Sequence, residues 1–296
     1  MKEKQFSKYQ ILANAVMIIW TLAIILPFIL LFMSSITDEN TLVANGYSFF
    51  PKKFSLASYS YIIKSGGQIL KAYGVSIGVT VVGTLLNVLL SALMAYPLSV
   101  KNLPGRNVMM FFVFFTMLFN GGIVPSYIMW TGTFHIKDTI FAQLLPNFLL
   151  SAWNVMMIRT YFTTSIPDGL YEAAEIDGAS QFTIFWKIVL PLGKPILVTM
   201  GTFAGLAYWN DWTNGLYYIV KNTGLYNVQN LLNQMVQNIQ FLTQSSNSNV
   251  TAAASTIPAT GIQMAIAFVA ILPIMLIFPS FQKYYAKGIA LGAVKG

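Results

Sequence analysis

Long apolar runs divide this chain into segments that are each long enough to cross a membrane. The first run, residues 11–33, is interrupted only by Asn14 and Thr21. At about 1.5 Å per helical residue it covers roughly 34 Å, against a hydrocarbon core of about 30 Å. Five similar runs follow. The predicted spans are 11–33, 72–99, 107–130, 139–163, 195–220 and 258–282. The pattern predicts an all-α, polytopic membrane bundle of six transmembrane helices.

The composition agrees with a chain that has lipid as part of its solvent. Hydrophobic residues make up 56% of the sequence and charged residues 9%, which leaves too little polar surface to cover a water-soluble globule. The formal net charge is +8, but the 17 Lys and Arg residues are scattered between apolar runs and form no basic stripe, so no nucleic-acid partner is expected. With no cysteine and a single histidine, His135, we expect no metal site.

The distribution of basic residues predicts the orientation of the spans. If the N-terminus is cytoplasmic, eleven Lys and Arg residues fall on that side and six on the other, which favours both termini in the cytoplasm. Three lysines within residues 1–10 could belong to a signal peptide. The apolar run is longer than a typical signal core and lacks an A-x-A site, so we expect an uncleaved anchor. One membrane domain, 11–282, would then lie between a cytoplasmic N-terminus, 1–10, and a cytoplasmic tail, 283–296.

Two long connections do not span, and connections of such length usually have a function. One is external, at residues 222–257, and is rich in Asn, Gln, Ser and Thr. The other is cytoplasmic, at residues 165–194. In the cytoplasmic connection Ser165 is a candidate N-cap and Pro167 fits a first helical turn, so a short helix is predicted from about 167 to 176.

Further signals predict a helix-turn-helix at the cytoplasmic surface. Gly178 can adopt the left-handed conformation that ends the first helix, Ser180 can cap a second, and Pro191 can stop it before the next span. On the first helix Leu170, Ala173 and Ala174 share a face by spacing. Paired alanines allow another protein surface to come close, so this face is predicted to dock a partner.

Nine positions of this connection resemble a known motif, the EAA loop of ABC importer permeases. They are Glu172, Ala173, Ala174, Asp177, Gly178, Ala179, Ile188, Leu190 and Pro191. In that family, of binding-protein-dependent inner-membrane transport components, the loop is a coupling helix seated in a groove of a cytoplasmic ATPase. The alternative for these residues is an ordinary amphipathic linker between two spans.

The resemblance covers nearly the whole chain and narrows to permeases of carbohydrate importers, particularly the MalG-like LplC and YtcP group. Three stretches carry it: 119–125 (FNGGIVP), 209–212 (WNDW) and 285–296 (YAKGIALGAVKG). It implies a type I importer fold in a bacterial cell membrane, with a second, different permease forming a heterodimer. It also implies two ATPase subunits and an extracytoplasmic sugar-binding lipoprotein. The chain would be a non-catalytic subunit that binds no cofactor, with ATP and Mg held by the partner ATPases.

Two polar sets are candidates for the substrate path. Gln143, Asn147, Ser151 and Asn154 would share one face of a continuous helix and could offer hydrogen bonds to a hydroxyl-rich cargo. The alternative is polar contact between helices.

The second set is Trp209, Asn210, Asp211 and Trp212, whose rings and polar groups suit stacking and hydrogen bonding to sugars. Its alternative is an interfacial aromatic belt. Asp211 is the single acidic residue in a predicted span, so it should face protein or water.

The sequence also limits the sources of energy and the competing functions. No G-x-x-x-x-G-K-[ST] loop is present, so the chain would depend on a partner for ATP. The alternatives are an ion-coupled secondary carrier, an ABC permease for another solute and, less well supported, a membrane enzyme or scaffold. Among related permeases the external loop reaches into the binding protein. By composition alone, residues 222–257 could equally be a flexible linker.

Overall fold

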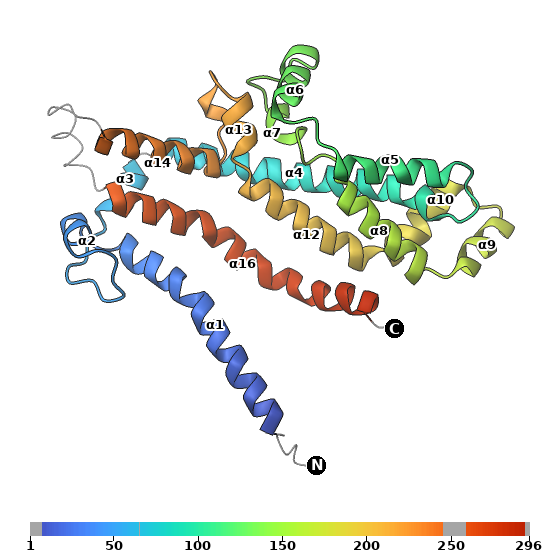
Figure 1. Ribbon diagram of the computed structural model, residues 1–296, viewed down its shortest axis with the longest axis horizontal. Helices are drawn as coiled ribbons and strands as arrows, with labels where there is room; N and C mark the ends of the chain where they lie inside the picture. The colour runs from blue at the N-terminus through green and yellow to red at the C-terminus, as the bar shows by residue number, and fades with distance from the viewer. Residues whose placement is uncertain (1–7, 65, 245–258, 294–296) are drawn as a thin grey trace. The chain divides into compact units, whose positions relative to one another are not determined.

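A computed structural model describes residues 8–64, 66–244 and 259–293, and every regular element in these ranges is helical (Figure 1). The predicted all-α class is therefore confirmed. The chain divides into two compact units. One comprises residues 1–69 and 232–273, and the other comprises 70–231 and 274–296.

Three described helices are long and apolar enough to cross a membrane. They are α1 (Lys8–Ser35), α4 (Gly66–Ser99) and α16 (Ala259–Ala293). Two further helix pairs pass the same test together but are bent, one by 110° and the other by 78°. The described residues thus supply three spans, or five if each bent pair counts as one, and the number six stays a prediction.

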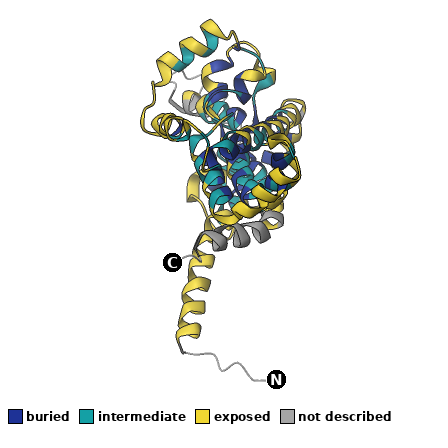
Figure 2. Cartoon of the chain, turned by 90° about the vertical axis from the view of Figure 1, so that its right-hand side faces the viewer, coloured by how far each residue is buried: buried dark blue, intermediate teal, exposed yellow. Residues whose placement is uncertain are grey.

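The first unit is organised around the C-terminal end of α1. Ser35 shares a 2.8 Å hydrogen bond with the Tyr59 hydroxyl on α3 (Ala57–Lys64), and Phe32 contacts Phe268 of α16. Glu39, at the start of α2 (Glu39–Asn45), accepts the first N–H groups of α16. A carboxylate at a helix N-terminus satisfies unpaired donors and complements the helix dipole. The rest of α1 is exposed over almost its full length (Figure 2).

The second unit contains the remaining helices, built along residues 70–99 of α4. They are α5 (Arg106–Leu118), α6 (Ile123–Ile128), η1 (Met129–Thr133), α7 (Phe141–Leu144), α8 (Ala152–Ser165), α9 (Asp168–Ile176), α10 (Gln181–Ile184), η2 (Phe185–Val189), α11 (Leu190–Leu192), α12 (Lys194–Asn210), α13 (Thr213–Tyr218) and η3 (Thr223–Leu225). Of α14 (Val228–Gln244), only the first turn lies in this unit, and its residues from Leu232 onward belong to the first unit.

Three apolar clusters lie in the described part of this unit, and two of them include residues of α4. At one end α8 supplies the fully buried Val155, Ile158 and Phe162, which pack against the helices that follow α9. Nearer the middle, α4, α7 and α12 meet through Val79, Leu144 and Tyr208. The Tyr208 hydroxyl donates a 2.9 Å hydrogen bond to the carbonyl of Leu144, so its polar end is paired where the ring is buried.

The continuous helix predicted for 139–163 is wrong. Helix is present at α7 and again at α8, but the chain between them turns. Pro146 has no N–H to donate to a helix, Asn147 has a left-handed φ of 68°, and the Ser151 side chain caps α8 instead of continuing a helix. The residues at 143 and 154 therefore do not lie on one helical face.

Two more of the predicted spans, 107–130 and 195–220, are broken where glycine or polar residues interrupt the apolar run. The span predicted for 107–130 is interrupted within the stretch 119–125, since α5 ends at Leu118 and α6 begins after Gly122. In the span predicted for 195–220, α12 ends at Asn210 and Asp211 is extended, so Trp209 and Trp212 are not i, i+3 neighbours on one helix.

Much of the external loop described by the structure is the helix α14, which the polar composition did not predict. The missed signal is the apolar spacing of Val228, Leu231, Leu232 and Met235, at i, i+3, i+4 and i+7. Residues 245–257 of the predicted loop lie outside the described residues.

Candidate functional site

The predicted helix-turn-helix is present at residues 168–192, and its turn is fixed by backbone hydrogen bonds. Gly178 has a φ of 75°, which L side chains rarely adopt. Its N–H donates to the carbonyl of Glu175 at 3.0 Å, and the N–H of Ala179 donates to that of Ala174 at 2.9 Å. This pair of bonds is a Schellman cap, which satisfies the last carbonyls of α9 and sets the angle of the turn.

The helix boundaries confirm most of the local expectations. The Ser180 side chain accepts the N–H of Thr183 and caps α10, as predicted. Pro167, not Ser165, occupies the N-cap of α9, because α8 continues through Ser165. The second helix continues past Pro191 to Leu192, and the chain bends by 78° at Gly193.

The nine residues of the EAA-like motif divide into two groups by burial. Ala174 is 8% exposed, and it packs with Ala179, Ile188 and Leu190 on the apolar cluster around α8. The others are exposed; they are Glu172, Ala173, Asp177, Gly178 and Pro191. The docking face predicted from Leu170, Ala173 and Ala174 is therefore wrong at Ala174, because that methyl group points into the core of this chain.

Side chains that the sequence did not single out attach α9 to the end of α4. The rings of Tyr96 and Tyr171 are stacked, with centroids 6.4 Å apart. Gln181 accepts a hydrogen bond from the Tyr96 hydroxyl and donates one to Glu175 at 2.9 Å. Lys101 forms an ion pair with Asp168 at the start of α9. These partners are far apart in the sequence, so local spacing gave no signal for them. A displacement of α9 would act directly on α4.

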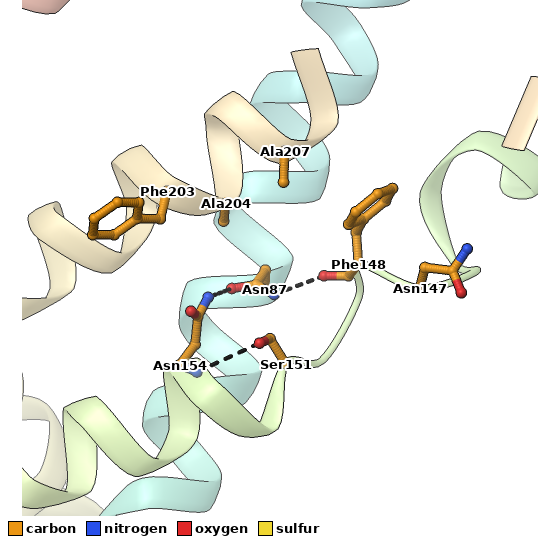
Figure 3. Close-up of a pocket in the computed structure, with 8 residues that line it drawn as sticks. All are labelled: Asn87, Asn147, Phe148, Ser151, Asn154, Phe203, Ala204 and Ala207. Carbon is orange, nitrogen blue, oxygen red and sulfur yellow. Dashed lines mark hydrogen bonds between the residues drawn. The ribbon is translucent and has the colours of Figure 1, made fainter. Parts of the chain in front are cut away.

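A polar pocket of about 320 Å³ lies between α4, the turn before α8 and α12 (Figure 3). Three of the four residues predicted to share a helical face line it: Asn147, Ser151 and Asn154. The break between α7 and α8, and not a common helical face, brings them together. The fourth, Gln143, is fully buried elsewhere and donates to Asn230 and to the carbonyl of Leu225.

Asn87 also lines the pocket, although the sequence analysis did not predict it. Its side chain donates a 2.6 Å hydrogen bond to the carbonyl of Phe148 and accepts one of 2.7 Å from Asn154 (Figure 3). An asparagine in the middle of the apolar run 72–99 was the available signal. The Asn147 amide points away from Asn87, and its hydrogen bond goes to Asn214 at 3.2 Å.

The lining is completed by apolar groups, Phe148, Phe203, Ala204 and Ala207. The pocket therefore offers amide and hydroxyl groups beside aromatic rings, with no charged side chain among its lining residues. Such a surface suits a neutral, hydroxyl-bearing ligand, because amides can both donate and accept hydrogen bonds.

The residues 209–212 do not line this pocket. Trp209 is buried and lies 6.4 Å from the ring of Tyr73, whereas Asn210 and Trp212 are exposed. Asp211 is 5% exposed, and its Oδ1 accepts hydrogen bonds from the backbone and hydroxyl of Thr213 and from the backbone of Asn214. It faces protein, as predicted, and shapes the break between α12 and α13.

Across the described ranges, no three His, Cys, Asp or Glu side chains gather closely enough to hold a metal ion. Three apolar helices of spanning length, two bent apolar helix pairs and a pocket lined by amides and aromatic rings are the features of a membrane-embedded transport component. A model of the family described as "Binding-protein-dependent transport system inner membrane component" matches residues 5–291, so the chain belongs to that family.

Known relatives agree over nearly the whole length. The chain is 36% identical over 272 residues to Protein LplC of Bacillus subtilis (strain 168), which covers 92% of this chain and 90% of LplC. It is also 36% identical over 288 residues to the polygalacturonan/rhamnogalacturonan transport system permease protein YtcP of the same organism. That match covers 97% of this chain and 98% of YtcP. It is also similar to a chain in the crystal structure of a bacterial ABC transporter involved in the import of the acidic polysaccharide alginate. That match has a TM-score of 0.78 and 25% identity, and covers 96% of this chain and 99% of that one.

Proposed function

We propose that this chain is the permease subunit of an ATP-binding-cassette importer that translocates a carbohydrate, of oligosaccharide size, delivered by an extracytoplasmic binding protein. The observation that carries the proposal is the helix-turn-helix at residues 168–192. It exposes Glu172, Ala173 and Asp177 and is anchored to α4 through Tyr96 and Gln181. An exposed helix that is attached firmly to α4 can transmit force from a partner ATPase to that helix.

The proposal extends to the partners of this chain. We infer that two ATPase subunits bind ATP and Mg, that one of them receives α9, and that a second, different permease completes a heterodimer. Closure of the ATPases would pull α9 and, through Tyr171 and Tyr96, the end of α4. Reversing a 1:99 equilibrium between inward-open and outward-open forms takes about 5.5 kcal/mol of differential binding, so the connection must be stiff.

The pocket around Asn87, Asn154 and Phe203 supports the carbohydrate cargo. Sugars present hydroxyl groups at their edges and C–H groups on their faces, which suit amides and aromatic rings respectively. YtcP is named for the transport of polygalacturonan/rhamnogalacturonan, and the solved transporter is described as importing the acidic polysaccharide alginate. We infer the same cargo class here.

The orientation is part of the proposal. With both termini in the cytoplasm of a bacterial cell, the helix-turn-helix faces the ATPases and α14 lies on the outer side. We infer that the loop 222–257 meets the docked binding protein, where its amides would compete for the cargo.

Affinity purification of the tagged chain in mild detergent, with mass spectrometry of the proteins that accompany it, tests the partners. Recovery of an ATPase and a second permease is expected, and both Glu172→Ala and Gly178→Pro in one chain should abolish recovery of the ATPase. Gly169→Ala is the matched control, because a β-carbon there meets open space on the same helix. A lone chain that moves solute in proteoliposomes without ATP would overturn the proposal in favour of an ion-coupled carrier.

A further inference from the structure

The first turn of α14 is tied to the break between α12 and α13 by buried amides. The Asn227 side chain accepts the N–H of Asn230 at 2.8 Å and donates to the carbonyl of Asp211 at 2.6 Å. The Asn230 side chain donates to the carbonyl of Trp212, and the N–H of Val228 donates to the Ser76 hydroxyl. The helix is therefore fixed at its base to two separate parts of the second unit.

The same network continues to the wall of the polar pocket. Asn214 follows the break, donates to the carbonyl of Pro146 at 3.1 Å and accepts a 3.2 Å hydrogen bond from Asn147. Asn147 is a pocket residue held in a left-handed conformation, and the carbonyl of the next residue, Phe148, receives the amide of Asn87. The position of the 146–148 turn thus depends on Asn214.

The Asn230 side chain is tightly packed against the backbone. Its side chain lies directly on Gly215, so closely that a β-carbon at that glycine would overlap the carboxamide. Asn214 and Asn230 are 1% and 5% exposed, and hydrogen bonds in such surroundings are strong and specific in geometry. A shift of Asn230 must therefore shift the chain at 212–215.

Two buried acceptor atoms beside this network lack a hydrogen-bond partner. Within the described residues, Oδ2 of Asp211 and Oε1 of Gln143 are buried without a hydrogen-bond partner. A network built for stability alone would pair them, since unpaired buried acceptors are costly. The unpaired acceptors leave room for a second arrangement of the same amides.

We propose that Asn214 and Asn230 are positioning residues that make the shape of the pocket follow the base of α14. This inference rests on the proposed function and extends it: contact at the outer helix would change the wall that the cargo meets. Neither amide lines the pocket itself, so the effect passes through Asn147 and the 146–148 turn.

The chain has no cysteine, which allows a direct test in the assembled transporter. Phe203→Cys places a thiol on an exposed pocket residue outside the network, and its rate of reaction with N-ethylmaleimide reports the shape of the pocket without any cargo. Asn230→Ala, Asn214→Ala and Gly215→Ala should each change that rate at least fivefold. Asn214→Asp keeps the acceptor for Asn147 and should lie nearer to the wild-type rate than Asn214→Ala.

The matched controls are Asn238→Ala, at an exposed asparagine two turns further along α14, and Gly132→Ala, at a glycine with open space around its Cα. Both should leave the rate within twofold of the parent. Rates within twofold for Asn230→Ala and Gly215→Ala in a complex with unchanged thermal midpoint would overturn the inference, as would an equal response to Asn238→Ala. Failure of the proposed function would instead appear as loss of ATP-dependent uptake by the wild-type complex, which this assay does not require.

Discussion

Tyr171 stacks on Tyr96, and this contact determines which side of α9 faces the rest of the chain. Tyr171 and Ala174, one turn apart, lie against the apolar cluster, whereas Glu172 and Ala173 are exposed. Burial raises the pKa of the Tyr171 hydroxyl, so the ring stays neutral at neutral pH. Two neighbouring alanines therefore have different roles.

Ala174→Leu should destabilise the protein, whereas Ala173→Leu should weaken only the contact with the ATPase. Overpacking a filled site costs about 1–3 kcal/mol, and a surface exchange changes stability by about 0.5 kcal/mol or less. Thermal denaturation and recovery of the ATPase in affinity purification separate the two effects. Equal thermal midpoints for the two variants would contradict the orientation of α9.

Gly178→Pro should uncouple ATP hydrolysis from uptake and leave membrane insertion intact. Proline fixes φ near −65°, whereas this turn needs 75°, and it removes the N–H that donates to Glu175. Gly178→Ala should be milder, because a left-handed alanine costs roughly 1–2 kcal/mol. Uptake and ATPase activity are measured together in proteoliposomes, and wild-type uptake by the proline variant would refute the role of this turn.

Asn87→Leu should lower stability through the loss of two partners at once. The carbonyl of Phe148 and the amide of Asn154 would remain buried without this partner, at a cost of about 1–3 kcal/mol each. Phe203→Leu, on an exposed residue of the same pocket, should leave the thermal midpoint nearly unchanged and act on uptake. An unchanged midpoint for Asn87→Leu would show that these hydrogen bonds contribute little.

Asp138 should make the stability of the contact between residues 138 and 220–222 sensitive to acid. Its carboxylate accepts the N–H groups of Lys221, Val220 and Asn222, and these bonds lower its pKa below the ordinary value. Because the folded pKa is depressed, the stabilisation is complete above the unfolded pKa of about 3.9 and is lost as the pH falls toward the folded one.

The measurement is the thermal midpoint of the purified complex from pH 7 to pH 3. Asp138→Asn keeps a residue that tolerates the left-handed φ of 58° but removes the charge, so its midpoint should be lower than wild type at pH 7, and the difference should narrow as the pH falls below about 3.9. Asp177→Asn, at an exposed carboxylate, is the charge-matched control. Parallel curves for wild type and Asp138→Asn would contradict the assignment.

The helix-turn-helix could be predicted because its signals are local. Gly178 and Ser180 determine a turn and a cap through bonds to residues within five positions, and sequence spacing shows such bonds directly. The identity of the exposed side of α9 could not be predicted, because it depends on Tyr96, 75 residues before Tyr171.

For the pocket, the predicted residues are correct but the predicted arrangement, one face of a continuous helix, is not. Asn147, Ser151 and Asn154 do line it, but a turn after Pro146 brings them together, and the periodicity of an apolar run hides such a turn. Asn87 was missed because its partners are more than 60 residues away. Long-range amide pairs leave no periodic trace in a sequence.

The exposure of α1 has a consequence for how this chain tolerates change. Residues from Ile11 to Ile25 on this helix are exposed, so they contribute little to the packed core of their own chain. Exchanges among leucine, isoleucine and valine there alter neither packed volume nor any hydrogen bond. The same exchanges at Val155 or Ile158, which are fully buried, alter the packed volume directly. Drift in sequence should therefore accumulate at one end of the chain while the helices around the pocket change slowly.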